Sequence, residues 1–275
     1  MVMADAVSGT LAQARAAVRE VVPRLFELVR SIPDAGSASV GAWTVGEVAA
    51  HLSHVFRFDT DAIAGKPVPD AVVTSAGMAE VNAKMLTRDE ERDPAALADR
   101  LGALAVEFDD VVSCSRTATT GWLQGVRVPP SVVACHLLEE CLMHGHDIAE
   151  AVGRPWAISR HHAVLAVEGG VLPLIEALPP TAFVDQEKAG AFRGRFELRL
   201  RGGGRTTMVF DRGSLTLDPG SARAVDAHIR ADPSALMLVF IGRRGLWKPL
   251  VGGQLAAWGP RPWKLARLLT AISPP

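Results

Sequence analysis

The stretch SVVACHLLEECLMHGHDIAEAVG, residues 131–153, decides the fold. Its apolar residues recur at spacings of three and four, which predicts an amphipathic helix through most of the stretch. Glu140 and His144 lie one turn apart at the edge of the apolar face, with His136 and Asp147 close beside them. A buried carboxylate and a buried imidazole need a partner, and one divalent metal ion satisfies both. Spacing alone also allows a solvated pair on the surface of a His-rich helix.

An earlier helix is predicted to begin directly after Trp43, because Thr44 and Glu47 have the spacing of a capping box. On this helix His51 lies at the rim of the apolar arc and points towards the interior of a helical bundle. His54 lies about 60° further out and is expected to meet solvent. Alone, His51 suits a core histidine bonded to a carbonyl group. Together with the pair on the later helix, it suits a third metal ligand.

The cysteines, and the other histidines and acidic residues near these helices, are not spaced in a way that predicts a further site. The cysteines include no C-x-x-C pair, so they predict neither a disulfide framework nor a zinc ribbon and are expected to be reduced. They are Cys114, Cys135 and Cys141. The residues expected to be solvated are Glu139, His146, Glu150, His161 and His162, and His228 is expected to have a structural role in a strand.

The whole chain is expected to fold as an α+β protein of two domains. Residues 1–180 have helical periodicity, although Pro23 is expected to kink or restart the first helix. Residues 190–275 alternate in strand fashion and add short helices, as in a small α/β domain. The stretches 64–93 and 116–129 are rich in Gly, Pro or charge and are expected to be connections, the first with room for a short helix. The predicted helices lie near 8–31, 44–63, 94–113, 130–152, 159–178, 233–241 and 261–272.

The composition limits the class of protein. With 275 residues, 48% hydrophobic and 21% charged, the chain is expected to be a soluble globular protein. It has no uninterrupted run of the roughly 18 apolar residues that a membrane span needs. Its N-terminus lacks the basic and apolar regions of a secretory signal. A cytoplasmic location, with no membrane partner, is therefore predicted.

The net charge of −1 hides an asymmetry between the two parts of the chain. From Phe192 onward there are 14 Lys+Arg and 5 Asp+Glu, about +9, while the preceding part carries about −10. Opposite charges predict two domains that dock, or a basic surface that faces an anionic substrate. Nucleic acid is not an expected partner, because no basic cluster with interleaved aromatic residues occurs and the chain has no Tyr. A monomer or a weak homodimer is expected.

Two segments resemble a known family. WTVGEVAAHL, residues 43–52, resembles the W-T-x-x-x-x-x-x-H-L segment of the DinB-like, mycothiol-dependent maleylpyruvate isomerases, and EECLMHGHDIAEAVGRPW resembles their E-x-x-x-H-G-x-D-[IL]-A-x-A-x-G segment. The resemblance implies an N-terminal four-helix bundle with zinc ligands at His51, Glu140 and His144. His146 departs from the pattern, since many members have Trp there. The C-terminal stretch 225–269 is similar to the sterol-carrier-protein-like α/β domain that accompanies this bundle.

The resemblance also implies a chemistry. Three protein ligands leave a fourth position on zinc, or on a similar divalent metal, for a thiol that becomes a thiolate near neutral pH. The implied thiol is mycothiol, which would add to an electrophilic alkene and be eliminated after rotation about the former double bond. Relatives have a catalytic arginine in the C-terminal domain. Arg243 is the best match here and Arg244 its rival, with a solvated loop arginine as the alternative.

Two other functions stay open on the sequence. A mycothiol S-transferase would conjugate the thiol to foreign electrophiles without eliminating it. A non-catalytic protein would bind a metal and a lipid, and a metal site closed by a fourth protein ligand such as His136 would favour it. The expected partners are mycothiol and a small, anionic electrophile.

Overall fold

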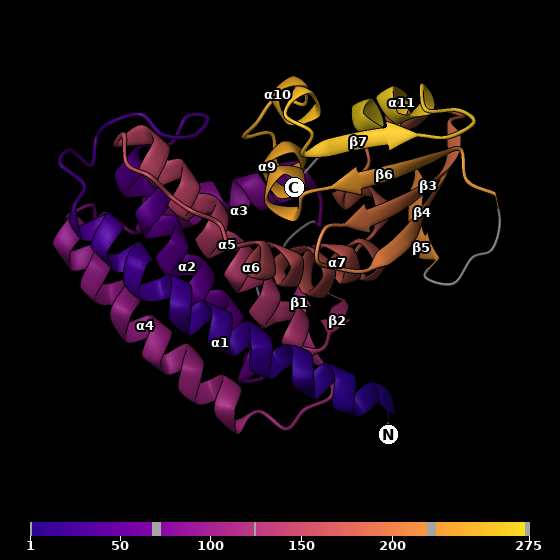
Figure 1. Cartoon of the computed structure of the whole chain (residues 1–275). Helices are drawn as coiled ribbons and strands as arrows, with labels where there is room; N and C mark the ends of the chain where they lie inside the picture. The colour runs from indigo at the N-terminus through magenta and orange to yellow at the C-terminus, as the bar shows by residue number, and fades with distance from the viewer. Residues whose placement is uncertain (1, 68–72, 124, 219–223, 273–275) are drawn as a thin grey trace. The chain divides into compact units, whose positions relative to one another are not determined.

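The computed structural model describes residues 2–67, 73–123, 125–218 and 224–272, and the chain divides into two compact units (Figure 1). The first, here the helical unit, comprises Met1–Ala71 and Ala79–Ile158. The second, here the sheet unit, comprises Val72–Met78 and Ser159–Pro275. The predicted α+β class is confirmed. Among the described helices, none combines the length and the apolar character that crossing a membrane requires.

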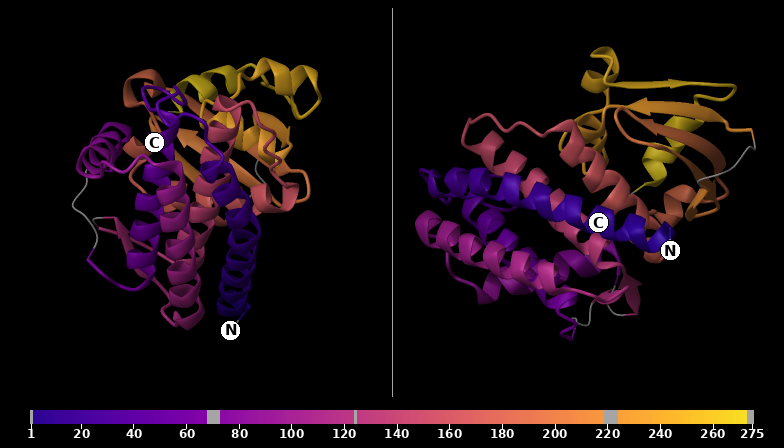
Figure 2. Two further views of the ribbon diagram at one scale, coloured as in Figure 1. Left: turned by 90° about the vertical axis from the view of Figure 1, so that its left-hand side faces the viewer. Right: turned by 60° about the horizontal axis from the view of Figure 1, so that its bottom comes forward.

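Four long helices form the helical unit, and each of the first two packs against both of the others (Figure 2). Leu25, Leu52, Leu101 and Leu137, one from each helix, are fully buried in the core between them. The predicted four-helix bundle is therefore confirmed. The helices are α1 (Val2–Arg30), α2 (Val45–Ile63), α4 (Pro94–Cys114) and α5 (Pro130–Ala151).

Local signals in the sequence set where these helices begin. The Thr44 hydroxyl accepts a hydrogen bond from the Glu47 amide, and the Glu47 carboxylate accepts one from the Thr44 amide at 2.8 Å, so the predicted capping box is present. Asp93 caps α4 in a similar way through the Ala96 amide. Pro23 does not restart the first helix, since α1 runs through it.

Two segments expected to be connections have regular structure. Within 64–93, where the sequence left room for a short helix, α3 spans Ser75–Arg88. Within 116–129, strands β1 (Thr120–Leu123) and β2 (Val126–Val128) pair as an antiparallel hairpin. The hairpin is fixed to α2, because the Thr120 hydroxyl donates a hydrogen bond to the Ala62 carbonyl. Strands this short leave too little alternation to be recognised in a sequence.

The sheet unit contains a five-stranded mixed sheet in the order β5-β4-β3-β6-β7 (Figure 1). Strand β6 runs parallel to β3, and the other neighbours are antiparallel. Along β3, Phe196, Leu198 and Leu200 are buried on one face, as the predicted alternation requires. The strands are β3 (Arg193–Leu200), β4 (Arg205–Asp211), β5 (Ser214–Asp218), β6 (Ala227–Ala231) and β7 (Leu255–Trp258).

Short helices complete the sheet unit. The predicted helices near 233–241 and 261–272 are α9 (Pro233–Phe240) and α11 (Lys264–Ala271). The others are η2 (Pro180–Ala182), α8 (Gln186–Ala189) and α10 (Trp247–Val251). Asp232 caps α9 through the Ala235 amide, as its position before Pro233 indicates.

The predicted helix 159–178 is one rod with an irregular middle. It consists of α6 (Arg160–Val164), the π-helical segment η1 (Leu165–Val171) and α7 (Leu172–Ala177). The Glu168 carboxylate accepts a hydrogen bond from the Gly204 amide in the β3–β4 turn. The rod belongs to the sheet unit, which begins at Ser159, whereas the sequence suggested a bundle domain reaching residue 180. Apolar spacing marks a buried helical face but does not identify what covers it.

Candidate metal centre

The three predicted ligands come together between two helices of the bundle. His51 lies on α2, and Glu140 and His144 lie on α5. The Nε2 atoms of His51 and His144 are 3.5 and 3.3 Å from Oε2 of Glu140. One ligand atom from each of the three residues can be chosen so that all lie within 4.8 Å of one another. Two donors about 2.0–2.1 Å from a tetrahedral zinc ion are themselves about 3.3 Å apart, so this arrangement fits such an ion.

The donor atoms are buried and incompletely satisfied. His51 and His144 are 6% and 3% exposed, and the side chain of Glu140 is 14% exposed. Among the described residues, Glu140 Oε2 and His51 Nδ1 have no hydrogen-bond partner. Burial alone would raise the pKa of Glu140, but the neighbouring imidazoles of His144 and His51 hold it well below its usual range. A buried carboxylate oxygen that stays ionised and has only these imidazoles beside it suits a cation.

Asp147 orients His144. Its Oδ2 is 2.9 Å from His144 Nδ1, which leaves Nε2 directed at Glu140. Burial lowers the pKa of His144, but Asp147 and Glu140 outweigh burial and raise it to about 9. Burial dominates at His51 and lowers its pKa, so this imidazole is neutral near pH 7. His51 can therefore bind a metal ion directly, whereas His144 must first lose a proton.

His136 supports the ligand carboxylate from the opposite side. Its Nε2 lies 3.5 Å from Oε1 of Glu140, and its Nδ1 lies 2.8 Å from Asp59. Trp122 of the β1–β2 hairpin donates a hydrogen bond to the other Asp59 oxygen at 3.0 Å. His136 is thus not in the group that converges, and this group of described residues offers three candidate ligands rather than four.

The sequence did not reveal Asp59 as part of this centre. It is fully buried on α2, eight residues after His51 and about 80° around the helix from it. A carboxylate on the inward side of an apolar helix is itself a signal, because such a group is rarely buried without a partner.

Trp43 and Gly145 shape the surroundings of the ligands. The Trp43 ring lies 4.9 Å from that of His51 and 6.4 Å from that of His144, measured between centroids. A Cβ atom on Gly145 would lie 2.3 Å from Trp156, whose indole donates a hydrogen bond to the Leu142 carbonyl at 3.0 Å. Gly145 therefore allows an aromatic ring to pack against α5 immediately beside His144.

Several side chains expected to be solvated are not. Glu139 is buried, and burial together with the charge of Glu140 raises its pKa to about 7. His54 is half-buried and lies 2.9 Å from Asp89, and His162 is buried. Those three expectations were wrong, because more than one face of each helix is covered. His146 and Glu150 are half-buried and exposed, respectively, and His161 is exposed.

Arg243 lies in the sheet unit, in the turn that follows α9. It is half-buried, and its guanidinium donates a hydrogen bond to the Ile241 carbonyl at 3.0 Å. Its neighbour Arg244 is also half-buried. The catalytic role that the resemblance implies for Arg243 stays a prediction.

Known proteins resemble this chain in sequence and in fold. Residues 11–149 match the family described as the mycothiol maleylpyruvate isomerase N-terminal domain. Crystal structures of the mycothiol-dependent maleylpyruvate isomerase, and of a histidine-to-alanine mutant of it, match with a TM-score of 0.53 at 16% and 14% identity. Each match covers 93% of this chain and 95% of the other, and shows a shared fold. No curated protein matches the sequence.

Removing one imidazole should remove the metal. We expect the purified protein to bind one zinc ion per chain and His144→Ala to bind none, because two of the three ligands do not hold the ion. His54→Ala is the matched control, since His54 lies on α2 but contacts Asp89 instead. Metal analysis by mass spectrometry measures the ratio. Full metal content in His144→Ala, or its loss in His54→Ala, contradicts this ligand assignment.

Metal binding should release protons at neutral pH. The pKa of about 9 means that His144 is protonated at pH 7 in the metal-free protein, and the ion must displace that proton. The apparent affinity should therefore rise about tenfold per pH unit from pH 7 towards 9 and level off above it. Calorimetry in two buffers of different ionisation enthalpy counts the protons.

Asp147→Asn tests the origin of this effect. It removes the charge that raises the pKa of His144, so fewer protons should be released at pH 7. Equal proton release in the two proteins contradicts the proposed role of Asp147.

Proposed function

Since the chain belongs to the mycothiol maleylpyruvate isomerase family through its N-terminal domain, we propose that it is a zinc-dependent isomerase that uses mycothiol as its thiol cosubstrate. The substrate class is a small, anionic, electrophilic alkene of the maleylpyruvate type. The observation that carries this proposal is the buried Oε2 of Glu140, which has no hydrogen-bond partner among the described residues and lies beside two imidazole nitrogens.

The proposed ligands are His51, Glu140 and His144. Two imidazoles and a carboxylate are a donor set that suits zinc. A zinc ion held there would supply Lewis acidity that lowers the pKa of a thiol entering its fourth position. Asp147 keeps Nε2 of His144 directed at the site, and His136 contacts Oε1 of Glu140, so that Oε2 is left for the ion.

Two of the protein's three thiols are poorly suited to act as the nucleophile. Burial raises the pKa of Cys135 to about 12 and that of Cys141 well above its usual value, so both stay protonated at neutral pH. Cys114 is exposed, at the C-terminal end of α4. Because the reacting species is a thiolate, the burial of Cys135 and Cys141 favours a thiol supplied from outside the chain.

A dianionic substrate also needs a cation. The excess of basic residues from Phe192 onward supports a role for the sheet unit in binding carboxylates. We assign this role to Arg243, whose planar guanidinium can bind a carboxylate through two parallel hydrogen bonds. Its turn, between α9 and α10, is half-buried and carries a second guanidinium on Arg244.

An added thiol should be required for turnover. With zinc and mycothiol, we expect the cis substrate to be converted into its trans isomer and the thiol to be recovered unchanged, as followed by proton NMR. The variant Cys114→Ser, Cys135→Ser, Cys141→Ser should keep most of its turnover, with stability losses of about 1–2 kcal/mol at each buried position. Turnover without added thiol, lost in this variant, would point to a protein nucleophile. Accumulation of a stable thioether would identify an S-transferase instead.

The two neighbouring arginines should differ. If Arg243 binds the substrate in the transition state, Arg243→Ala should lower turnover about 10²–10³-fold with the metal retained, and Arg244→Ala should have a milder effect. Steady-state kinetics and metal content are measured on the same preparations. Wild-type turnover in Arg243→Ala removes this residue from the site.

A further inference from the structure

Asp59 is an acidic side chain without access to water. It lies on α2 and is fully buried. Its Oδ1 accepts a hydrogen bond from the indole of Trp122 at 3.0 Å, and its Oδ2 lies 2.8 Å from Nδ1 of His136. Apolar residues of similar volume often replace a buried ionic pair at no loss of stability, so packing alone does not explain this carboxyl group. Its contacts join α2 to α5 and to the β1–β2 hairpin, which indicates a role in positioning.

The ring of His136 is held between two acidic residues. One nitrogen, Nδ1, faces Asp59, and the other, Nε2, lies 3.5 Å from Oε1 of Glu140. The Trp122 ring packs against the imidazole edge to face, with 4.9 Å between the centroids. A hydrogen bond at one nitrogen of a histidine fixes the direction of the other. Asp59 and Trp122 therefore aim Nε2 of His136 at one particular oxygen of Glu140.

The two oxygens of Glu140 thus have different neighbours. Oε1 has His136 beside it, whereas Oε2 has the Nε2 atoms of His51 and His144 at 3.5 and 3.3 Å. If the carboxylate binds a tetrahedral zinc ion through Oε2 alone, the three residues supply three donors and a fourth position stays open. If both oxygens bind, the same residues supply four donors and the position is closed. The surroundings of Oε1 therefore decide whether the metal can accept another molecule.

We propose that His136, held by Asp59 and Trp122, is a positioning residue that keeps Oε1 of Glu140 away from the metal. It acts through the ligand carboxylate and does not bind the ion itself. The fourth position thereby stays available to a thiol. This inference rests on the proposed metal centre and thiol cosubstrate, and it explains why a ligand with two oxygens contributes one.

Cobalt(II) in place of zinc tests the proposal on the full chain, because its visible absorption is strong in four-coordinate sites and weak in five-coordinate ones. The probe thiol is 2-mercaptoethanol, whose binding adds a sulfur-to-cobalt charge-transfer band. The double variant Asp59→Asn, His136→Leu removes both partners together, so that no buried charge is left alone. It should still bind one cobalt ion per chain, since the three ligands are unchanged. Its strong visible bands should be lost, and the thiol should bind about tenfold or more weakly because it must displace a carboxylate oxygen.

Two further variants separate positioning from stability. Trp122→Phe keeps a ring beside His136 but removes the hydrogen bond to Asp59, so it should change the spectrum and the thiol affinity in the same direction, by less. It also serves if the double variant fails to fold. Thr120→Val is the matched control, because it removes the other hydrogen bond between the hairpin and α2, to the Ala62 carbonyl. Its cobalt spectrum and thiol affinity should equal those of the wild type.

The outcomes distinguish this inference from the proposed function. Wild-type bands and thiol affinity in a folded double variant or in Trp122→Phe overturn the positioning role alone, as does an equal change in Thr120→Val. A wild-type protein that binds no cobalt, or binds it without taking up the thiol, contradicts the proposed function and the positioning role together. Metal content is measured on the same preparations, so that loss of the ion is not mistaken for a change in its coordination.

Discussion

A carboxylate with little access to water governs the helical unit. Glu140 keeps its negative charge inside the bundle because His144 and His51 lie beside it. This pairing links α2 to α5, since one imidazole comes from each helix, and a charge left alone there would be strongly destabilising. Thr44 fixes where α2 begins and so which direction His51 faces, and Gly145 lets Trp156 pack beside His144. The same requirement for charge compensation makes the centre suitable for a cation.

Local spacing was sufficient to single out the three residues that converge, but not the groups around them. Glu140 and His144 share one turn of a helix, and a capping box positions His51, so all three have signals within a few residues. The contact between His136 and Asp59 joins residues 77 positions apart and depends on how two helices pack. Glu139 was expected to be solvated because a helical wheel assigns one buried face. Helix α5 packs against both α1 and α2, so a wider arc is covered.

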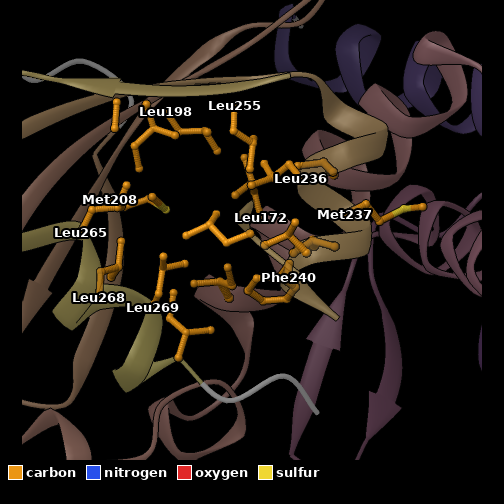
Figure 3. Close-up of a pocket in the computed structure, with 18 of the residues that line it drawn as sticks. Leu172, Leu198, Met208, Leu236, Met237, Phe240, Leu255, Leu265, Leu268 and Leu269 are labelled. Atoms are coloured by element: carbon orange, nitrogen blue, oxygen red, sulfur yellow. The ribbon is translucent and has the colours of Figure 1, made fainter. Parts of the chain in front are cut away.

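In the sheet unit, the strands and one helix were predictable from the sequence, but the start of the unit was not. Its strands were predictable from alternation, and α9 from Asp232 and Pro233, because these signals are local. The start of the unit was not, since the rod that begins at Arg160 has the same apolar spacing as a bundle helix. The sheet unit also encloses an apolar cavity, with Leu172, Leu198 and Met208 among its lining residues (Figure 3). This cavity is invisible in the sequence, because its lining residues come from all parts of the unit and have the composition of an ordinary core. Only the packing shows that they enclose a space.

The π-helical segment Leu165–Val171 sets the direction in which the side chains after it in the rod point. A regular α-helix turns about 100° per residue, whereas bonds from residue i to i+5 hold more of the chain in each turn. Gly169 and Gly170, which favour a regular helix least among residues other than proline, lie within the wide turn. Leu172 and Ile175, which follow this segment, line the apolar cavity of the sheet unit. A one-residue deletion in the segment would convert it to an α-helix and leave the direction of Leu172 and Ile175 nearly unchanged. A change from π-helical to α-helical hydrogen bonds without a deletion would instead rotate both side chains away from the cavity. The rod is therefore more tolerant of a change in length here than of a change in hydrogen-bonding pattern.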